Sequence, residues 1–371
     1  MAKLTFTSNP EPTMGVEIEL ALVDNGTLAL TSAIQPILER LSRPASEHVK
    51  PELMQCYLEI NTGICRRVDE AEADLRRSLK AVQQAADEVG VSLLWSATHP
   101  FSSWKDQQLT PNERYENLIR LLQDTGRQLI TFGLHVHVGV DSGDKAVMIC
   151  EQIEPYLPLL LALSANSPCW EGRITGLHST RSKVMESLPT AGLPVQLRNW
   201  SEYTWLINHL VETGFINTIR EIWWDVRPHH NFGTVEVRVC DMPASLDEAM
   251  ALAALIQCLV RYLSECIDEG YYQSDAHPMM VRQNKWRAAR YGRGARLVDP
   301  QTLRPRSVPE LVAELLETLR PTADALGCRE YLERVTCLAT HPTGSERQLA
   351  LLEQYGPEET VRRLAAGTRV E

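Results

Sequence analysis

Two glutamates alternate with apolar residues near the N-terminus, in the segment GVEIEL (15–20). Successive side chains of a β-strand point to opposite faces, so Glu17 and Glu19 share one face while the apolar residues share the other. A face turned to water would explain the pattern, although Thr, Lys and Ser serve that purpose without charge repulsion. Two neighbouring carboxylates repel each other and are better suited to a bound cation.

Two further strand-like segments add carboxylates and imidazoles to the same design. In ELMQCYLEINT, Glu59 alternates with apolar residues and Glu52 lies just upstream. In GLHVHVGV, three valines alternate with His135 and His137, which therefore share one face. Neutral imidazole is a good metal ligand, and its second nitrogen can be fixed by hydrogen bonding. A lone histidine would be more typical of a structural role, whereas the pair is equally consistent with a metal or phosphate site.

A fourth segment, TVEVRVCD, places Glu236 and Arg238 on one strand face, opposite its valines. Alone, Glu-x-Arg is most often a surface ion pair. If the four segments share one sheet, their polar faces line one cavity with Glu17, Glu19, Glu59, His135, His137, Glu236 and Arg238. Burying so many carboxylates without compensation would cost a prohibitive free energy.

This set of residues favours divalent-cation chemistry on phosphates. Oxygen-rich coordination with an imidazole indicates Mg²⁺ or Mn²⁺ rather than zinc. Such ions beside an arginine suit the binding of ATP phosphates during phosphoryl transfer. The sequence contains neither a GxxxxGK[ST] loop nor a dinucleotide-binding GxGxxG motif, so we expect a nucleotide to be held through metals and arginine.

Periodicity predicts the elements that must position these residues. We expect strands over residues 14–23, 56–62, 91–96, 132–140 and 234–239, and helices over residues 31–41, 66–89, 112–125, 146–163, 201–221, 246–268, 308–320 and 345–366. Strands and helices alternate without a strict βαβ order, which favours an α+β domain with an antiparallel sheet. We expect residues 1–371 to form a single domain, with a helical C-terminal extension from about residue 293 packed on the sheet.

Composition and charge narrow the function classes. The chain of 371 residues is 44% hydrophobic and 23% charged, as in an ordinary globular protein, and its net charge is −11. A nucleic acid or an anionic membrane requires clustered positive charge, so neither is an expected partner. The nine scattered cysteines include no CxxC pair, which favours reduced thiols and a cytoplasmic location. The longest apolar stretch, residues 249–263, is interrupted by polar residues and is too short to span a bilayer, so it predicts a buried helix.

Seven motifs follow one another along the chain: GVEIEL (15–20), ELMQCYLEINT (52–62), NERY (112–115), GLHVHVGV (133–140), LSANSPCWEGRITGLHSTR (163–181), DVRPHHNFGTVEVRVCD (225–241) and NKWRAARYG (284–292). Together they resemble the second class of glutamate–cysteine ligases, the YbdK-type carboxylate–amine ligases of the glutamine synthetase-like superfamily. The resemblance implies a fold built on a curved antiparallel β-sheet flanked by helices. Cys56 departs from the small hydroxyl residue expected there, and this change leaves the acidic residues intact.

The resemblance also implies roles for individual residues. The implied metal ligands are Glu17, Glu19, Glu52, Glu59, His135 and Glu236. The implied catalytic residues are Arg227, Arg238 and His137, of which His137 and Arg238 would contact phosphate. Arg173 and Arg181 would join them in binding the acyl phosphate or the substrate carboxylates. The alternative for each arginine is an ordinary loop or surface position.

The implied activity is the ATP-dependent joining of a carboxylate to an amine, with γ-glutamylcysteine as the expected product. ATP would phosphorylate the γ-carboxylate of glutamate, and the amine of cysteine would then displace phosphate. No segment displays a thiol-recognition motif, so other amines stay open. Two alternatives also stay open: a metal-dependent hydrolase of an amide or similar small molecule, and a catalytically weak protein that binds a nucleotide or amino acid. A homodimer is expected from base rates.

Overall fold

The computed structural model describes residues 4–272, 276–367 and 369–370. Its centre is a sheet with strand order β10-β11-β5-β1-β3-β2, in which β4 also pairs with β1. Every pairing in this sheet is antiparallel. Its strands are β1 (Met14–Asp24), β2 (Val49–Pro51), β3 (Tyr57–Asn61), β4 (Val91–Leu94), β5 (Gly133–Gly139), β10 (Val226–His229) and β11 (Thr234–Asp241).

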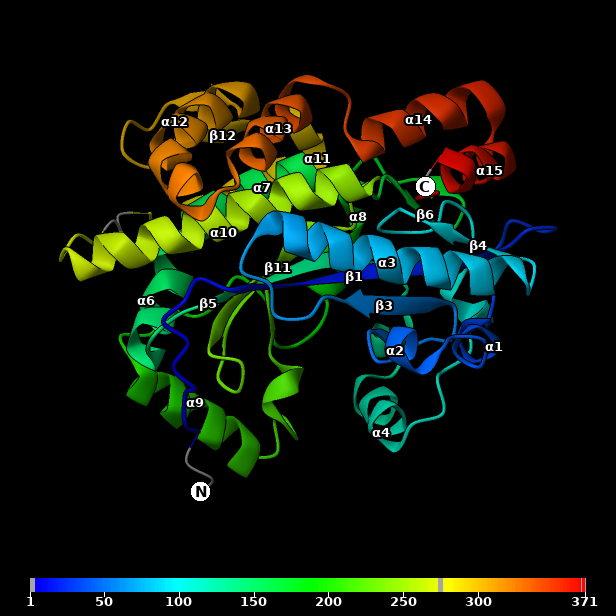
Figure 1. The fold of residues 1–371 in the computed structure, drawn as a ribbon, viewed down its shortest axis with the longest axis horizontal. Helices are drawn as coiled ribbons and strands as arrows, with labels where there is room; N and C mark the ends of the chain where they lie inside the picture. The colour runs from blue at the N-terminus through cyan, green and yellow to red at the C-terminus, as the bar shows by residue number, and fades with distance from the viewer. Residues whose placement is uncertain (1–3, 273–275, 368, 371) are drawn as a thin grey trace.

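Helices flank the sheet. They are α1 (Ile34–Leu38), α2 (Arg43–Ser46), α3 (Val68–Asp87), α4 (Glu113–Leu122), α5 (Asp124–Arg127), α6 (Gly143–Ile153), α7 (Leu157–Ser164), α8 (Thr180–Met185), α9 (Trp200–Glu212), α10 (Leu246–Asp268), α11 (Pro278–Tyr291), α12 (Val308–Leu326), α13 (Arg329–Thr340), α14 (Gly344–Tyr355) and α15 (Pro357–Gly367). Figure 1 shows α3 and α10 along one side of the sheet, with α12 to α15 stacked beyond them, and α4 and α9 on the other side. The predicted α+β class, with an antiparallel sheet flanked by helices, is confirmed.

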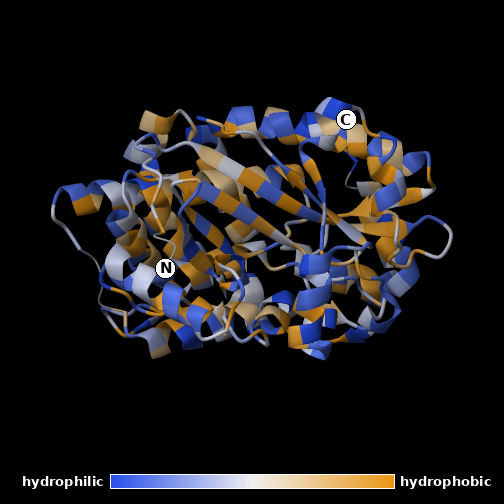
Figure 2. Cartoon of the chain, turned by 90° about the horizontal axis from the view of Figure 1, so that it is seen from below, coloured by the Kyte–Doolittle hydropathy of each residue, from blue (hydrophilic) through white to orange (hydrophobic). Residues whose placement is uncertain are grey.

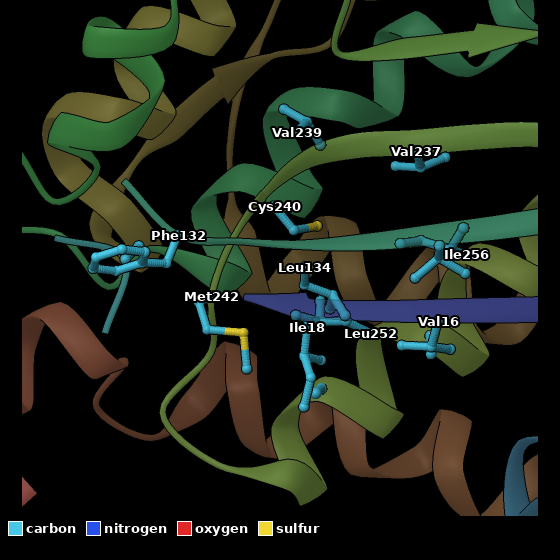
Figure 3. Packing of buried hydrophobic residues seen from close by; sticks show 14 of the residues in the cluster. Val16, Ile18, Phe132, Leu134, Val237, Val239, Cys240, Met242, Leu252 and Ile256 are labelled. Atoms are coloured by element: carbon cyan, nitrogen blue, oxygen red, sulfur yellow. The ribbon is translucent and has the colours of Figure 1, made fainter. Parts of the chain in front are cut away.

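The apolar faces of the central strands pack against α10. Val16 and Ile18 of β1 and Leu134 of β5 are at most 1% exposed, and they lie beside Leu252 and Ile256 of α10 (Figure 3). Figure 2 shows the alternation of hydrophobic and hydrophilic residues along the strands. A register slip of one residue would turn the apolar set away from α10, so this packing fixes which side chains occupy the opposite face.

Two helical stretches, Gly143–Ser164 and Leu246–Asp268, are long and apolar enough to cross a membrane by length and composition alone. The most apolar 18-residue segments of these stretches are 78% and 72% buried inside the protein, and the core helices of soluble proteins have the same length and composition. The buried helix predicted over residues 246–268, which contains the apolar stretch 249–263, is confirmed at these bounds. All nine cysteines are free thiols.

Proline and glycine divide the helices more finely than their periodicity predicts. The helix expected over residues 146–163 is interrupted at Pro155 by the 3₁₀ turn η2 (Glu154–Tyr156). The helix expected over residues 201–221 ends at Glu212, just before Gly214 with φ +73°. The C-terminal helix expected over residues 345–366 is divided into α14 and α15 at Gly356, where φ is +77°.

Short strands and turns complete the described structure. The small strands are β6 (Cys169–Trp170), β7 (Arg173–Ile174), β8 (Ala191–Gly192), β9 (Trp223–Trp224), β12 (Arg296–Val298) and β13 (Pro305–Ser307), and the other 3₁₀ turns are η1 (Trp104–Asp106), η3 (Ile219–Glu221) and η4 (Gly292–Gly294). The β12–β13 hairpin precedes α12, so the segment expected to be helical from residue 293 is not helical throughout. The assignment of the whole chain to one domain stays a prediction.

Candidate active site

Strand pairing places the predicted site residues side by side on the sheet face opposite the apolar core. The cross-strand pairs are Glu17–His135, Glu19–Glu59, Glu236–His137 and Arg227–Glu236. Directly paired residues of neighbouring strands project from the same face of a sheet. The structure therefore brings the polar residues of the four predicted strand segments together on one face.

One part of this face is rich in carboxylates. We call it the acidic end and define it as Glu17, Glu19, Glu52, Glu59 and His135. One ligand atom from each of Glu17, Glu59 and His135 lies within 4.8 Å of the others. His135 Nδ1 is 3.4 Å from Glu17 Oε2, and its buried Nε2 has no hydrogen-bond partner among the described residues. The nearest ammonium to Glu59 is that of the exposed Lys50, 3.5 Å from Oε1.

The crowding of carboxylates at the acidic end shifts the pKa values of its glutamates. Burial, together with the nearby carboxylates of Glu17 and Glu19, raises the pKa of Glu59 to about 7. Burial and the Glu59 carboxylate raise the pKa of Glu52 well above its usual range. Burial would also raise the pKa of Glu17, but hydrogen bonds from two histidines outweigh it and hold that pKa well below its usual range. The acidic end thus carries more negative charge from glutamates than the neighbouring basic side chains neutralise.

The other part of the face is neutralised by arginine. We call it the guanidinium end and define it as Arg227, Glu236, Arg238 and His137. Arg227 Nε donates to Glu236 Oε2 at 2.7 Å, and Arg238 Nη1 donates to Glu236 Oε1. The Glu236 side chain is 1% exposed. Burial would raise the pKa of Glu236, but the two guanidinium groups hold it well below its usual range.

His137 joins the two ends. Its Nε2 is 3.5 Å from Glu17 Oε1 and 3.9 Å from Glu236 Oε1. Burial would lower the pKa of His137, but these carboxylates outweigh burial and raise it. The rings of His229 and Phe232 lie 5.3 and 5.6 Å from the His137 ring, and they stack on each other. Neither residue was predicted from the sequence to lie at the site, although both belong to the motif DVRPHHNFGTVEVRVCD.

Arg173, on β7, and Arg181, in the first turn of α8, lie in different surroundings. Arg181 is 4% exposed, and it donates to the carbonyls of Val239 at 3.4 Å and Arg238 at 3.3 Å. Its guanidinium lies against Gly133, whose N–H donates to Glu19 Oε2 at 2.6 Å. Arg173 is exposed on β7, and within the described ranges no hydrogen bond or ion pair joins it to the site. A substrate-binding role for Arg173 stays a prediction.

The residues present fit a divalent cation at the acidic end. Carboxylate oxygens and one imidazole are ligands that Mg²⁺ and Mn²⁺ accept, and the buried His135 Nε2 is available for coordination. A second group, Glu17, His137 and Glu236, is equally close in space, but Glu236 is already paired with two guanidinium groups. The ligand roles predicted for Glu17, Glu19, Glu52, Glu59, His135 and Glu236 all stay predictions, and so do the phosphate and substrate roles predicted for the arginines and His137.

Residues 13–367 match the model of the glutamate–cysteine ligase family 2. The chain belongs to this family. A provisionally named glutamate–cysteine ligase 2 of Gloeobacter violaceus is 43% identical over 357 residues, covering 95% of each chain. A relative of Thermobifida fusca with the same provisional name is 41% identical over 359 residues, covering 95% of this chain and 90% of its own.

A solved structure, the glutamate–cysteine ligase of Francisella tularensis in complex with AMP, superimposes with a TM-score of 0.72 over 99% of this chain and 90% of that one. The sequence identity is 14%, so this likeness shows the fold. The predicted glutamine synthetase-like fold is confirmed. Family 2 membership makes the chain an ATP-dependent carboxylate–amine ligase, as the motifs predicted, and favours neither the hydrolase nor the non-catalytic alternative.

Proposed function

We propose that this family 2 member forms γ-glutamylcysteine from glutamate and cysteine through a γ-glutamyl phosphate. One observation carries the proposal: an acidic end suited to cations lies beside a guanidinium end suited to phosphate on one sheet face. A reaction that transfers a phosphoryl group needs both, because charge must be neutralised around the transferring group and its neighbours. The names of the relatives supply glutamate and cysteine as the substrates.

The chain's residues would divide the work between the two ends. Glu17, Glu59 and His135 would hold Mg²⁺ or Mn²⁺, with Glu19 and Glu52 beside them. A cation held by these residues would supply positive charge to offset the negative charge that develops on the ATP phosphates. His137, Arg238 and Arg227 would contact phosphate from the guanidinium end, and Arg173 and Arg181 would bind the acyl phosphate or a substrate carboxylate. The AMP in the Francisella tularensis ligase supports an adenine nucleotide as the ligand.

The reaction then runs in two balanced steps. A γ-carboxylate oxygen of glutamate attacks the γ-phosphorus of ATP, so that an acyl phosphate forms and ADP leaves. The amine of cysteine attacks the acyl carbon, loses a proton and expels inorganic phosphate. The protein's contribution is to orient the reactants in line and neutralise charge, which accounts for much of the rate of phosphoryl transfer. No side-chain nucleophile is needed, and eight of the nine cysteines are buried.

An ADP-release assay tests the proposal. The protein would be incubated with Mg·ATP, glutamate and each of a panel of amino acids and simple amines. We expect ADP release to require glutamate and to be fastest with cysteine, with γ-glutamylcysteine identified by mass spectrometry. Faster turnover with another amine would replace cysteine as the acceptor. Absence of stimulation by every carboxylate–amine pair would overturn the proposed function.

The proposed substrates indicate where in the cell the enzyme acts. ATP and free amino acids are small molecules of the cytoplasm, and we propose that the protein acts there without a nucleic acid or membrane partner. The homodimer expected from base rates stays a prediction, which light scattering of the purified protein would test.

A further inference from the structure

A buried carboxylate, Asp241, ends β11, three residues after Arg238 of the guanidinium end. We propose that Asp241 is a positioning residue, which anchors the loop of residues 164–181 so that Arg181 is held where it can bind an anionic group of the substrates. The proposal rests on the proposed function, because the anion is the phosphoryl group or a carboxylate of the ligation reaction.

The carboxylate of Asp241 is completely buried and receives three hydrogen bonds from this loop. Its Oδ2 accepts from Ser167 Oγ at 2.6 Å and from the N–H of Asn166 at 3.0 Å. Its Oδ1 accepts from Ser179 Oγ at 2.8 Å. Asp241 is 0% exposed, so no hydrogen bond to bulk water replaces these contacts. Both ends of the loop are therefore tied to the last residue of the strand that carries Glu236.

The same contacts continue to Arg181. Ser167 Oγ, which donates to Asp241, also accepts from the backbone N–H of Arg181 at 3.0 Å. The strand pairing shifts register between Val237 and Cys240, and the carbonyls of Arg238 and Val239 within this interval accept from the Arg181 guanidinium. Gly133 leaves room for the guanidinium opposite it, because an added Cβ would lie 2.1 Å from Arg181 Nη2 and would force the guanidinium to shift. Backbone and side chain of Arg181 are thus fixed by the same strand end.

The charge of Arg181 is balanced without a direct ion pair. Arg227 and Arg238 both hydrogen-bond the Glu236 carboxylate, whereas the Arg181 guanidinium donates to neutral carbonyls. Its Nε is buried and has no partner in the described part of the chain. The negative charge nearby is that of Asp241, which interacts electrostatically with Arg181 and is linked to its backbone by hydrogen bonds through Ser167. An anion can therefore bind Arg181 without breaking a salt bridge, which a directly paired arginine would have to do.

Arg181 also shares its surroundings with the guanidinium end. Arg181 and Arg238 line one small cavity of about 10 Å³ with Trp223 and Trp224. Such a volume is about that of one water molecule, so a substrate group would reach Arg181 only after a small shift of the cavity wall. Small displacements of the loop would therefore change the reach of the guanidinium, and its anchoring matters for the reaction.

A double-mutant cycle tests the inference in the full-length enzyme. The variants are Asp241→Asn, Arg181→Ala and their combination, with Glu154→Gln as a matched control that alters a buried carboxylate outside the site. We expect Asp241→Asn to lower kcat/KM for glutamate by about 10- to 100-fold, because misplacement of a catalytic group by about 1 Å has costs of this order. In the Arg181→Ala background, the same change should cost less than about threefold, because its effect is already lost. Glu154→Gln should keep the wild-type kcat/KM.

The outcomes separate the inference from the proposed function. An equal loss on Asp241→Asn with and without Arg181 would show a general structural effect and overturn the inference. If Asp241→Asn does not fold, Ser167→Ala takes its place in the cycle, since it removes the hydroxyl that joins the two residues. If the wild-type protein turns over no carboxylate–amine pair, the proposed function fails. The same cycle is then measured on the Kd for Mg·ATP by calorimetry, where independence of the two residues again overturns the inference.

Discussion

The acidic and guanidinium ends occupy the same sheet face, yet they solve the problem of buried charge in opposite ways. At the guanidinium end, Glu236 is paired with two arginines, and the pKa of its carboxyl is held well below its usual range. At the acidic end, burial and neighbouring carboxylates raise the pKa of Glu59 to about 7, and its salt-bridge partner Lys50 is half exposed. At the guanidinium end, arginines neutralise the buried carboxylate, whereas the carboxylates of the acidic end lack enough positive charge beside them.

This difference indicates which end depends on a ligand for its stability. A buried ion pair balances its own desolvation, whereas like charges held together without a counter-ion destabilise the fold until something binds. We therefore expect the acidic end to lower the stability of the free protein, which is consistent with the proposed cation site. His137, which contacts a carboxylate from each end, makes the two ends one site.

The largest expected effect is loss of turnover from a change at the acidic end. Glu59→Gln keeps the shape of the side chain but removes a carboxylate from the proposed cation site. We expect ADP release to fall by about a thousandfold, because a metal contributes several kcal/mol of transition-state stabilisation. The melting temperature of the metal-free protein should rise, since repulsion with Glu17 and Glu19 is relieved. Mg²⁺ should raise the melting temperature of the wild type and not that of Glu59→Gln.

The Glu154→Gln variant provides the control for that experiment. Glu154 is 4% exposed, and burial raises its pKa to about 8, so the variant should also be more stable than the wild type at neutral pH. Its ADP release should be unchanged. Wild-type turnover by Glu59→Gln would remove the acidic end from the mechanism.

At the guanidinium end the corresponding change should mainly lower stability. Glu236→Gln leaves Arg227 and Arg238 buried beside a neutral amide. Removing one member of a buried ion-pair network typically costs 3–5 kcal/mol, and we expect about 3 kcal/mol because the amide retains a hydrogen-bond acceptor. Unfolding in urea, followed by tryptophan fluorescence, measures this loss. A Glu236→Gln protein as stable as the wild type would show that the arginines are not dependent on this carboxylate.

Much of this comparison could be predicted from alternation along the strands. Glu17 and Glu236 each follow a valine and His135 follows Leu134, and one core on α10 forces all three polar side chains to the opposite face. Antiparallel registers could not be read from the sequence, and they decide which charges become neighbours. Glu-x-Arg at 236–238 suggested an ion pair, but the second partner, Arg227, enters through the pairing of β10 with β11.

The hydrogen-bond network that holds Arg181 in place could not be predicted from sequence patterns. Asp241 ends a strand and Ser167 and Ser179 lie in a loop, where polar residues are ordinary. Only their convergence in three dimensions makes them a network. In the same way, periodicity predicted the long helix α10 at its observed bounds, whereas the breaks at Pro155 and Gly356 depend on single residues that periodicity overlooks.

The two ends should also respond to pH in opposite directions, which is the smallest of the expected effects. The folded-state pKa of Glu236 is depressed, so the stability that it contributes is present above its unfolded pKa and is lost as the pH falls through the folded pKa. The folded-state pKa of Glu59 is raised to about 7, so the stability that it contributes is present below its unfolded value of 4.5 and is lost as the pH rises through 7. Metal-free protein should therefore be most stable near pH 5, and Glu59 should account for a loss of about 2 kcal/mol between pH 5 and pH 8.

Melting curves across this range, in EDTA and in excess Mg²⁺, check the expected signs. Mg²⁺ should remove the part of this loss that comes from Glu59, because the cation favours the carboxylate form that high pH produces. The part that comes from Glu154, which lies outside the site and whose pKa is raised to about 8, should remain in Mg²⁺. Glu59→Gln should show a flatter profile above pH 5 in EDTA, while the acid limb below pH 5 should remain because Glu236 is unchanged. A metal-free wild type whose stability rises from pH 5 to pH 8 would mean that the acidic end is already neutralised by the protein, as the guanidinium end is.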